Sequence, residues 1–213
     1  MGPKTAGVGI CQGDVGTGNR FPSPAFEAKV TTVYDGFASL ARRMTQLVVD
    51  VYGLPNGWVE EEFAAPTLTA FKVLHYPPPP EEDCHGLRMA PHVDIDALTV
   101  LYQDPGVPGG LQVNVGGEWQ DVSAPPGTLV VNVGELLKFL SGGIVMCTEH
   151  RVVMPSLAER ANSERVSMAL FLSPRDTTLI RRYSAQHVHS STDEVCTAGQ
   201  WFQNYLSQFG ANE

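Results

Sequence analysis

Residues 87–133 read LRMAPHVDIDALTVLYQDPGVPGGLQVNVGGEWQDVSAPPGTLVVNV, a run of short apolar segments separated by glycine, proline and aspartate. Segments of about four to eight residues with this character predict β-strands rather than helices. The Gly116-Gly117 pair predicts a tight hairpin, because glycine accepts the positive backbone angles that such a turn needs. The same texture continues on both sides, and we expect about eight strands, at 67–76, 87–93, 97–103, 110–115, 118–122, 127–133, 145–154 and 165–173.

Helical spacing of apolar residues marks other parts of the chain. Residues 25–54 repeat apolar side chains every three or four positions, which predicts a long amphipathic helix packed on a sheet. Shorter helices are expected at 58–64, 134–143 and 199–209. Together these elements predict a mainly β fold, a jelly roll (double-stranded β-helix) of two facing antiparallel sheets with a long N-terminal helix and a short C-terminal helix.

The 213 residues fit one globular domain flanked by two less regular segments. Residues 1–24 are rich in glycine and end in Pro22 and Pro24, so we expect a flexible leader. The jelly-roll domain with its helices is expected over 25–182. A C-terminal extension, a polar stretch followed by a helix, is expected over 183–213.

Composition excludes several classes of protein. Hydrophobic residues make up 43% of the chain and charged residues 17%, which is typical of a globular protein and not of a disordered one. A net charge of −9 disfavours binding to nucleic acid or to an anionic membrane. No apolar run approaches the roughly 18 residues of a membrane span. The four cysteines lack a paired spacing, and the N-terminal residues lack the charged-then-apolar layout of a signal peptide, so we expect reduced thiols and a cytoplasmic protein.

His92, Asp94 and His150 are candidate metal ligands. His92 and Asp94 are two residues apart in a strand-like segment, and side chains two apart on a strand point to the same face. His150 lies in a later strand, and distant strands of a jelly roll converge inside the barrel. Two histidines and one carboxylate leave coordination positions open, which suits Fe(II) that must also bind oxygen and a substrate. Taken alone, the His-x-Asp pair is also compatible with an ordinary surface pairing.

Arg165 and Ser167 are candidate ligands of a carboxylate. Their spacing places a guanidinium and a hydroxyl on one face of a strand, an arrangement that holds a carboxylate through charge-assisted hydrogen bonds. The alternative is an arginine at the end of a strand, exposed to solvent and paired with Glu164 or Glu149.

In order and spacing, five segments of the chain resemble the 2-oxoglutarate/Fe(II)-dependent dioxygenases of the isopenicillin N synthase-like class. The segments are PHVDIDALTVLYQD, GGLQVNVGGEWQDV, GTLVVNVGELLKFLSGG, EHRVV and RVSMALFLSP. The resemblance runs from about residue 25 to 174. It implies that His92, Asp94 and His150 bind Fe(II), that Arg165 and Ser167 hold the far carboxylate of 2-oxoglutarate, and that Tyr76 supports the same carboxylate.

The resemblance also implies an activity. Proteins of this class couple the oxidative decarboxylation of 2-oxoglutarate by O2, which yields succinate and CO2, to the oxidation of an organic substrate. Hydroxylation is the commonest outcome. The partner is then expected to be a small molecule, although a partner protein that completes the pocket stays open.

Three departures from the family pattern stand out. Leu74 replaces an asparagine that many members carry two residues before the tyrosine. Asp96 stands where a small residue is usual and is a competing candidate ligand near the metal. Only about two dozen residues precede the long helix, where members usually carry a larger segment that helps to cover the active site.

Alternatives stay open at this point. An oxidase of the same fold would use Arg165 and Ser167 for the carboxylate of its own substrate, and a degenerate member would be a binding protein. Cys84-His85 with Cys147-x-x-His150 is a rival arrangement for a structural zinc site.

Overall fold

The computed structural model describes residues 6–11, 21–52, 57–64, 68–79, 86–107, 110–183 and 196–210. The helices are α1 (Pro24–Tyr52), α2 (Trp58–Glu62), α3 (Glu135–Leu140) and α4 (Ala198–Gly210), with one 3-10 turn at Arg160–Asn162. The strands are β1 (Ala6–Cys11), β2 (Ala70–Tyr76), β3 (Leu87–His92), β4 (Leu98–Gln103), β5 (Leu111–Val115), β6 (Glu118–Asp121), β7 (Val130–Val133), β8 (His150–Val153), β9 (Arg165–Leu172), β10 (Leu179–Ile180) and β11 (Cys196–Thr197).

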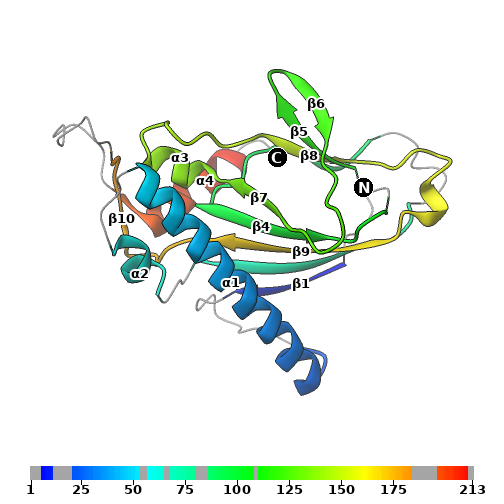
Figure 1. Ribbon diagram of the computed structural model, residues 1–213, viewed down its shortest axis with the longest axis horizontal. Helices are drawn as coiled ribbons and strands as arrows, with labels where there is room; N and C mark the ends of the chain where they lie inside the picture. The colour runs from blue at the N-terminus through cyan, green and yellow to red at the C-terminus, as the bar shows by residue number, and fades with distance from the viewer. Residues whose placement is uncertain are drawn as a thin grey trace.

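Two antiparallel sheets form the body of the molecule (Figure 1). The larger has the strand order β1-β2-β9-β4-β7, and the smaller has the order β3-β8-β5-β6. Strands β10 and β11 pair separately. The predicted jelly roll is confirmed, and each of the eight predicted strands lies in one of the two large sheets as β2 to β9.

The prediction of a flexible leader over residues 1–24 is wrong for one segment. Residues Ala6–Cys11 form β1, which pairs with β2 along six positions at the edge of the larger sheet. The glycines that favoured a leader without regular structure are compatible with an edge strand, where backbone hydrogen bonds alone supply the pairing. The rest of the stretch up to residue 20 lies outside the described residues.

Helix α1 starts one residue before its predicted boundary and covers the outer face of the larger sheet (Figure 1). Ser23 explains the start, since its hydroxyl oxygen accepts a hydrogen bond from the Phe26 N–H at 3.2 Å and thereby caps the helix. The buried face packs through aromatic side chains, with Tyr34 and Phe37 edge-on to Phe71 of β2 at ring-centroid distances of 6.2 and 5.5 Å. Among the described residues, no helix is long and apolar enough to span a membrane.

The turn between β5 and β6 is the predicted glycine hairpin. Gly116 and Gly117 have φ angles of 64° and 94°, which residues with a β-carbon rarely adopt. The Asn114 side-chain oxygen also accepts a hydrogen bond from the Gly117 N–H at 2.9 Å.

Candidate iron and cosubstrate site

Strand register brings the two candidate histidines together. His92 ends β3 and His150 begins β8, and the two residues are direct partners in this antiparallel pair. Their rings lie 4.3 Å apart, centroid to centroid. The Nδ1 atom of His92 lies 2.8 Å from the Ala90 carbonyl oxygen, and that of His150 lies 3.2 Å from the Thr148 carbonyl oxygen. Both Nε2 atoms can therefore face a shared ligand.

Asp94 completes this group with one carboxylate oxygen. Its Oδ1 atom lies 3.6 Å from Nε2 of His92 and 3.6 Å from Nε2 of His150. Its Oδ2 atom accepts hydrogen bonds from the Thr99 hydroxyl at 2.6 Å and the Asn132 amide at 2.8 Å. The three donor atoms lie within 4.8 Å of one another, and this is the one such cluster found in the described part of the chain. A donor set of two imidazoles and one oriented carboxylate fits a divalent iron ion.

Register across the larger sheet also brings together the candidate carboxylate ligands. Tyr76 of β2 faces Arg165 of β9, while Ser167 is paired with Leu74 on one side and Gln103 of β4 on the other. The Arg165 guanidinium lies 4.5 Å from the centre of the Tyr76 ring, and its Nη1 donates to the Gln103 Oε1 at 3.4 Å.

Arg165 is buried and forms no ion pair with any of the described residues. Its side chain is 4% exposed, and burial lowers the pKa of the guanidinium. Its Nε atom is buried and has no hydrogen-bond partner among the described residues. A buried guanidinium with a free donor is costly unless an anion binds it, which favours a carboxylate ligand at this position. The alternative of a solvent-exposed Arg165 is wrong.

A cavity of about 90 Å³ between the two sheets joins these two groups of residues. It is lined by the three candidate metal ligands at one place and by Tyr76, Arg165 and Ser167 at another. Leu74, which replaces the asparagine usual in the family, also lines it. The geometry therefore provides a metal position and a carboxylate position within one cavity.

Comparison with known proteins agrees with this arrangement. The model of the 2OG-Fe(II) oxygenase superfamily matches residues 68–174, which contain all six candidate site residues. The chain belongs to this superfamily. Fe(II), 2-oxoglutarate and O2 are accordingly the metal and cosubstrates of its family.

Individual relatives within the 2OG-Fe(II) oxygenases extend the match. Gibberellin 2-beta-dioxygenase 5 of rice is 36% identical over 171 residues, covering 79% of this chain and 48% of the relative. Deacetoxycephalosporin C hydroxylase of Streptomyces clavuligerus is 28% identical, covering 92% of this chain and 65% of the relative. A full-length Neurospora crassa protein, crystallised in complex with alpha-KG, has a TM-score of 0.82 at 24% identity, covering 96% of this chain and 65% of that one, and shows the shared fold. The chain spans about half the length of the first of these relatives.

Asp96, the competing candidate ligand, does not join the oxygenase metal cluster. Burial and the neighbouring Asp94 raise the pKa of Asp96 well above its usual value. Its Oδ2 lies 2.9 Å from the Thr99 hydroxyl, which in turn contacts Asp94. The Thr99 hydroxyl thus lies within hydrogen-bond distance of both carboxyl groups and links Asp96 to the ligand Asp94.

Backbone hydrogen bonds fix the loop that carries Asp94. The N–H groups of Glu135 and Leu136, at the start of α3, donate to the carbonyl oxygens of Asp94 and Asp96 at 2.7 and 3.1 Å. The Gly134 N–H donates to the Ala97 carbonyl at 3.1 Å. A β-carbon at Gly134 would overlap the Asp96 carbonyl oxygen. Glycine is thus required here for close approach of two backbone segments, not for a positive φ.

We expect Gly134→Ala to destabilise the protein and to displace the Asp94 loop. Overpacking against backbone costs about 1–3 kcal/mol, which for a domain of this size lowers Tm by roughly 2–4 °C for each kcal/mol. Gly36→Ala in the exposed middle of α1 is the matched control, because a β-carbon there meets nothing within 4 Å and should stabilise the helix by about 0.5–1 kcal/mol. Thermal unfolding of both variants tests this, and equal Tm values would contradict it.

Helix α4 packs behind the metal loop. The Tyr205 hydroxyl donates to the Val93 carbonyl oxygen at 3.4 Å, and the Trp201 ring lies 4.8 Å from the Phe139 ring of α3. Burial raises the pKa of Tyr205. The C-terminal aromatics therefore pack against the structure around the site.

The described residues give no support to the rival structural zinc site. Cys84 and His85 lie outside them, and the Cys147 thiol donates to the Glu135 carboxylate at 3.0 Å. Among the described residues, Cys147 forms no disulfide.

Thr99, Asn132 and Gln103 contact the site residues but were not predicted from the sequence. Each lies on a strand whose register decides which distant residue it meets, and the sequence shows no such register. One signal was available for Thr99 and Gln103. Together with Leu101 they occupy alternate positions of the predicted strand 97–103, which places the three side chains on one face, and all three line the cavity.

Asn132→Leu should weaken metal binding by about 10- to 100-fold, because it removes a donor that orients Asp94 Oδ2. Titration with Mn(II) followed by calorimetry measures the affinity. Asn204→Leu, on the exposed side of α4, is the matched control and should leave the affinity unchanged. Equal affinities in the two variants would show that Asn132 does not orient the ligand.

Proposed function

We propose that this protein is a 2-oxoglutarate-dependent Fe(II) dioxygenase that oxidises a small organic molecule. In the hydroxylation form of the reaction, 2-oxoglutarate, O2 and a substrate C–H bond give succinate, CO2 and the corresponding alcohol. One oxygen atom of O2 enters succinate and the other enters the alcohol.

The orientation of Asp94 carries the proposal. Two hydrogen-bond donors hold Oδ2, while Oδ1 is equidistant from the two histidine nitrogens. A purely structural carboxylate would be expected to turn both oxygens to donors. Asp94 instead presents one oxygen to the space that His92 and His150 share.

Each of the six site residues has a role in binding the metal or the cosubstrate. His92, Asp94 and His150 hold Fe(II), which when bound supplies the coordination and activation of O2. Arg165 and Ser167 bind the distal carboxylate of 2-oxoglutarate, and Tyr76 packs on the guanidinium and holds it in place. Side chains from both sheets line the cavity that would hold the cosubstrate.

The walls between these groups are apolar. Leu101, Val113, Val130, Ala169 and Phe171 line the cavity alongside the polar groups. Such a site binds small molecules through apolar contact and a few oriented polar groups. Relatives whose names give small-molecule substrates, such as the gibberellin dioxygenase, support a substrate of this class. The absence of a nucleic-acid or membrane partner, expected from the sequence, stays a prediction.

Anaerobic reconstitution tests the function. Protein loaded with Fe(II) and then with 2-oxoglutarate should develop the weak visible absorption of the chelated iron, and admission of O2 should yield succinate. Succinate formation in proportion to substrate consumed supports the dioxygenase.

Two results would replace this proposal. Oxidation of the substrate without formation of succinate would indicate the alternative oxidase, in which Arg165 and Ser167 bind the carboxylate of the substrate itself. Absence of both the absorption and succinate, in protein that binds no Fe(II), would indicate a binding protein.

A further inference from the structure

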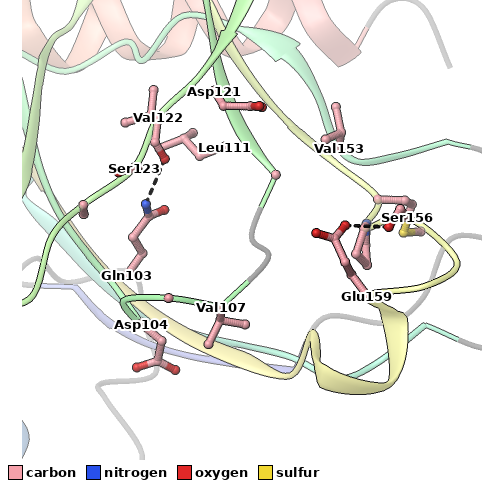
Figure 2. A pocket seen from close by; sticks show the side chains of 15 residues that line it. Gln103, Asp104, Val107, Leu111, Asp121, Val122, Ser123, Val153, Ser156 and Glu159 are labelled. Carbon is pink, nitrogen blue, oxygen red and sulfur yellow. Dashed lines mark hydrogen bonds between the residues drawn. The ribbon is translucent and has the colours of Figure 1, made fainter.

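A second cavity lies beyond the carboxylate position and is larger than the first, at about 380 Å³ (Figure 2). Its lining comes from the ends of β4, β5 and β6 and from the segment after β8. The two cavities share two lining residues, Gln103 and Leu111. Gln103 belongs to the larger sheet and Leu111 to the smaller, so side chains from opposite sheets meet the boundary between the cavities.

Hydrogen bonds fix the orientation of the Gln103 amide. Its Oε1 accepts from Arg165 Nη1 at 3.4 Å, and its Nε2 donates to the Val122 carbonyl oxygen at 3.2 Å. A guanidinium only donates and a carbonyl only accepts, so the amide cannot flip without losing both bonds. Figure 2 shows the amide directed toward the backbone at Val122, with Leu111 on the same side of the cavity.

The position of Gln103 relative to the clamp formed by Arg165 and Ser167 follows from strand register. Gln103 is the direct partner of Ser167, and Arg165 lies two residues before Ser167 on β9, on the same face of the strand. Gln103 and Leu111 are 9% and 7% exposed. The boundary therefore stands directly beside the groups assigned to the distal carboxylate.

We infer that Gln103 and Leu111 set the length of the 2-oxo dicarboxylate that the enzyme accepts. This inference rests on the proposed role of Arg165. With the boundary intact, the distal carboxylate must be bound in the first cavity, at a chain length that suits 2-oxoglutarate. Without it, Arg165 Nη1 loses its Gln103 partner, and the space that the two side chains vacate can take the added methylene of a longer diacid.

Calorimetric titration of Mn(II)-loaded protein with 2-oxoglutarate and 2-oxoadipate measures the selectivity as a ratio of Kd values. A tight pocket discriminates against one added methylene by roughly 10- to 200-fold. Gln103→Ala should lower the ratio at least about tenfold. Leu111→Ala should lower it similarly, while leaving the affinity for 2-oxoglutarate closer to that of the wild type, because it keeps both hydrogen bonds of Gln103.

Gln103→Leu separates volume from hydrogen bonding. Leucine keeps most of the side-chain volume and neither hydrogen bond, so the variant should bind 2-oxoglutarate more weakly and still reject 2-oxoadipate. Gln120→Ala, on the exposed face of β6, is the matched control and should leave both Kd values unchanged. Circular dichroism and Tm verify that each variant is folded.

The outcomes distinguish this inference from the proposed function. If Arg165→Gln weakens 2-oxoglutarate binding but both alanine variants keep the wild-type ratio, the boundary does not set the length and the clamp assignment stands. If Arg165→Gln binds 2-oxoglutarate as the wild type does, the clamp assignment and the inference built on it are both overturned.

Discussion

His150→Ala should lose stoichiometric iron binding, and turnover with it. The substitution removes one of the three donor atoms that converge within 4.8 Å, and Asp94 cannot compensate because Thr99 and Asn132 hold its second oxygen. Removing a residue that only orients a ligand costs about 10- to 100-fold in affinity, so we expect a larger loss for a ligand itself. Iron content after anaerobic loading and gel filtration measures the effect.

His75→Ala is the matched control for this experiment. His75 lies on β2, is 45% exposed, and pairs with Glu164 at 2.9 Å. Its replacement should leave iron content and turnover unchanged. Full iron stoichiometry in His150→Ala would remove His150 from the metal site.

Arg165→Gln should weaken 2-oxoglutarate binding at least about 30-fold while changing iron affinity little. Loss of one partner of a buried charge pair costs roughly 2–5 kcal/mol, and about 1.4 kcal/mol corresponds to a factor of ten. The metal group shares the cavity with Arg165, but among the described residues the guanidinium donates to Gln103 and forms no ion pair with Asp94. The Kd of 2-oxoglutarate for Mn(II)-loaded protein measures the effect.

Arg175→Gln provides the matched arginine control. Arg175 is 42% exposed and pairs with Glu62 at 3.2 Å, on a surface that lines neither of the two cavities described above. It should bind 2-oxoglutarate normally. Equal affinity in the Arg165 and Arg175 variants would point to another residue as the carboxylate ligand.

Much of the fold was predictable because strands and turns leave local signals. Short apolar segments bounded by glycine and proline located eight of the nine strands of the two large sheets, and Gly116-Gly117 located the hairpin. β1 was missed because its glycines are typical of a leader, and its identity as a strand depends on pairing with β2. The two-residue strands β10 and β11 are too short for any periodic pattern.

The site was predictable where its residues are close in sequence. The two-residue spacing of His92 and Asp94, and of Arg165 and Ser167, follows directly from strand geometry. The pairing of His92 with His150 depends on the register of β3 against β8, which the sequence does not display. The support of Asp94 by Asn132 depends likewise on tertiary packing across 38 positions.

The attachment of the Asp94 loop to α3 has a consequence for how this protein can change over evolutionary time. Its hydrogen bonds join peptide groups, and a peptide group is the same whatever side chain it carries. The identity of the α3 side chains therefore does not set these bonds directly, although Leu136, Leu137 and Leu140 are fully buried and constrained by core packing. The exception is Gly134, where a single added methyl group would push the two segments apart. Libraries that vary α3 can therefore sample the partly exposed positions Glu135 and Lys138, as long as that glycine and the three buried leucines are kept.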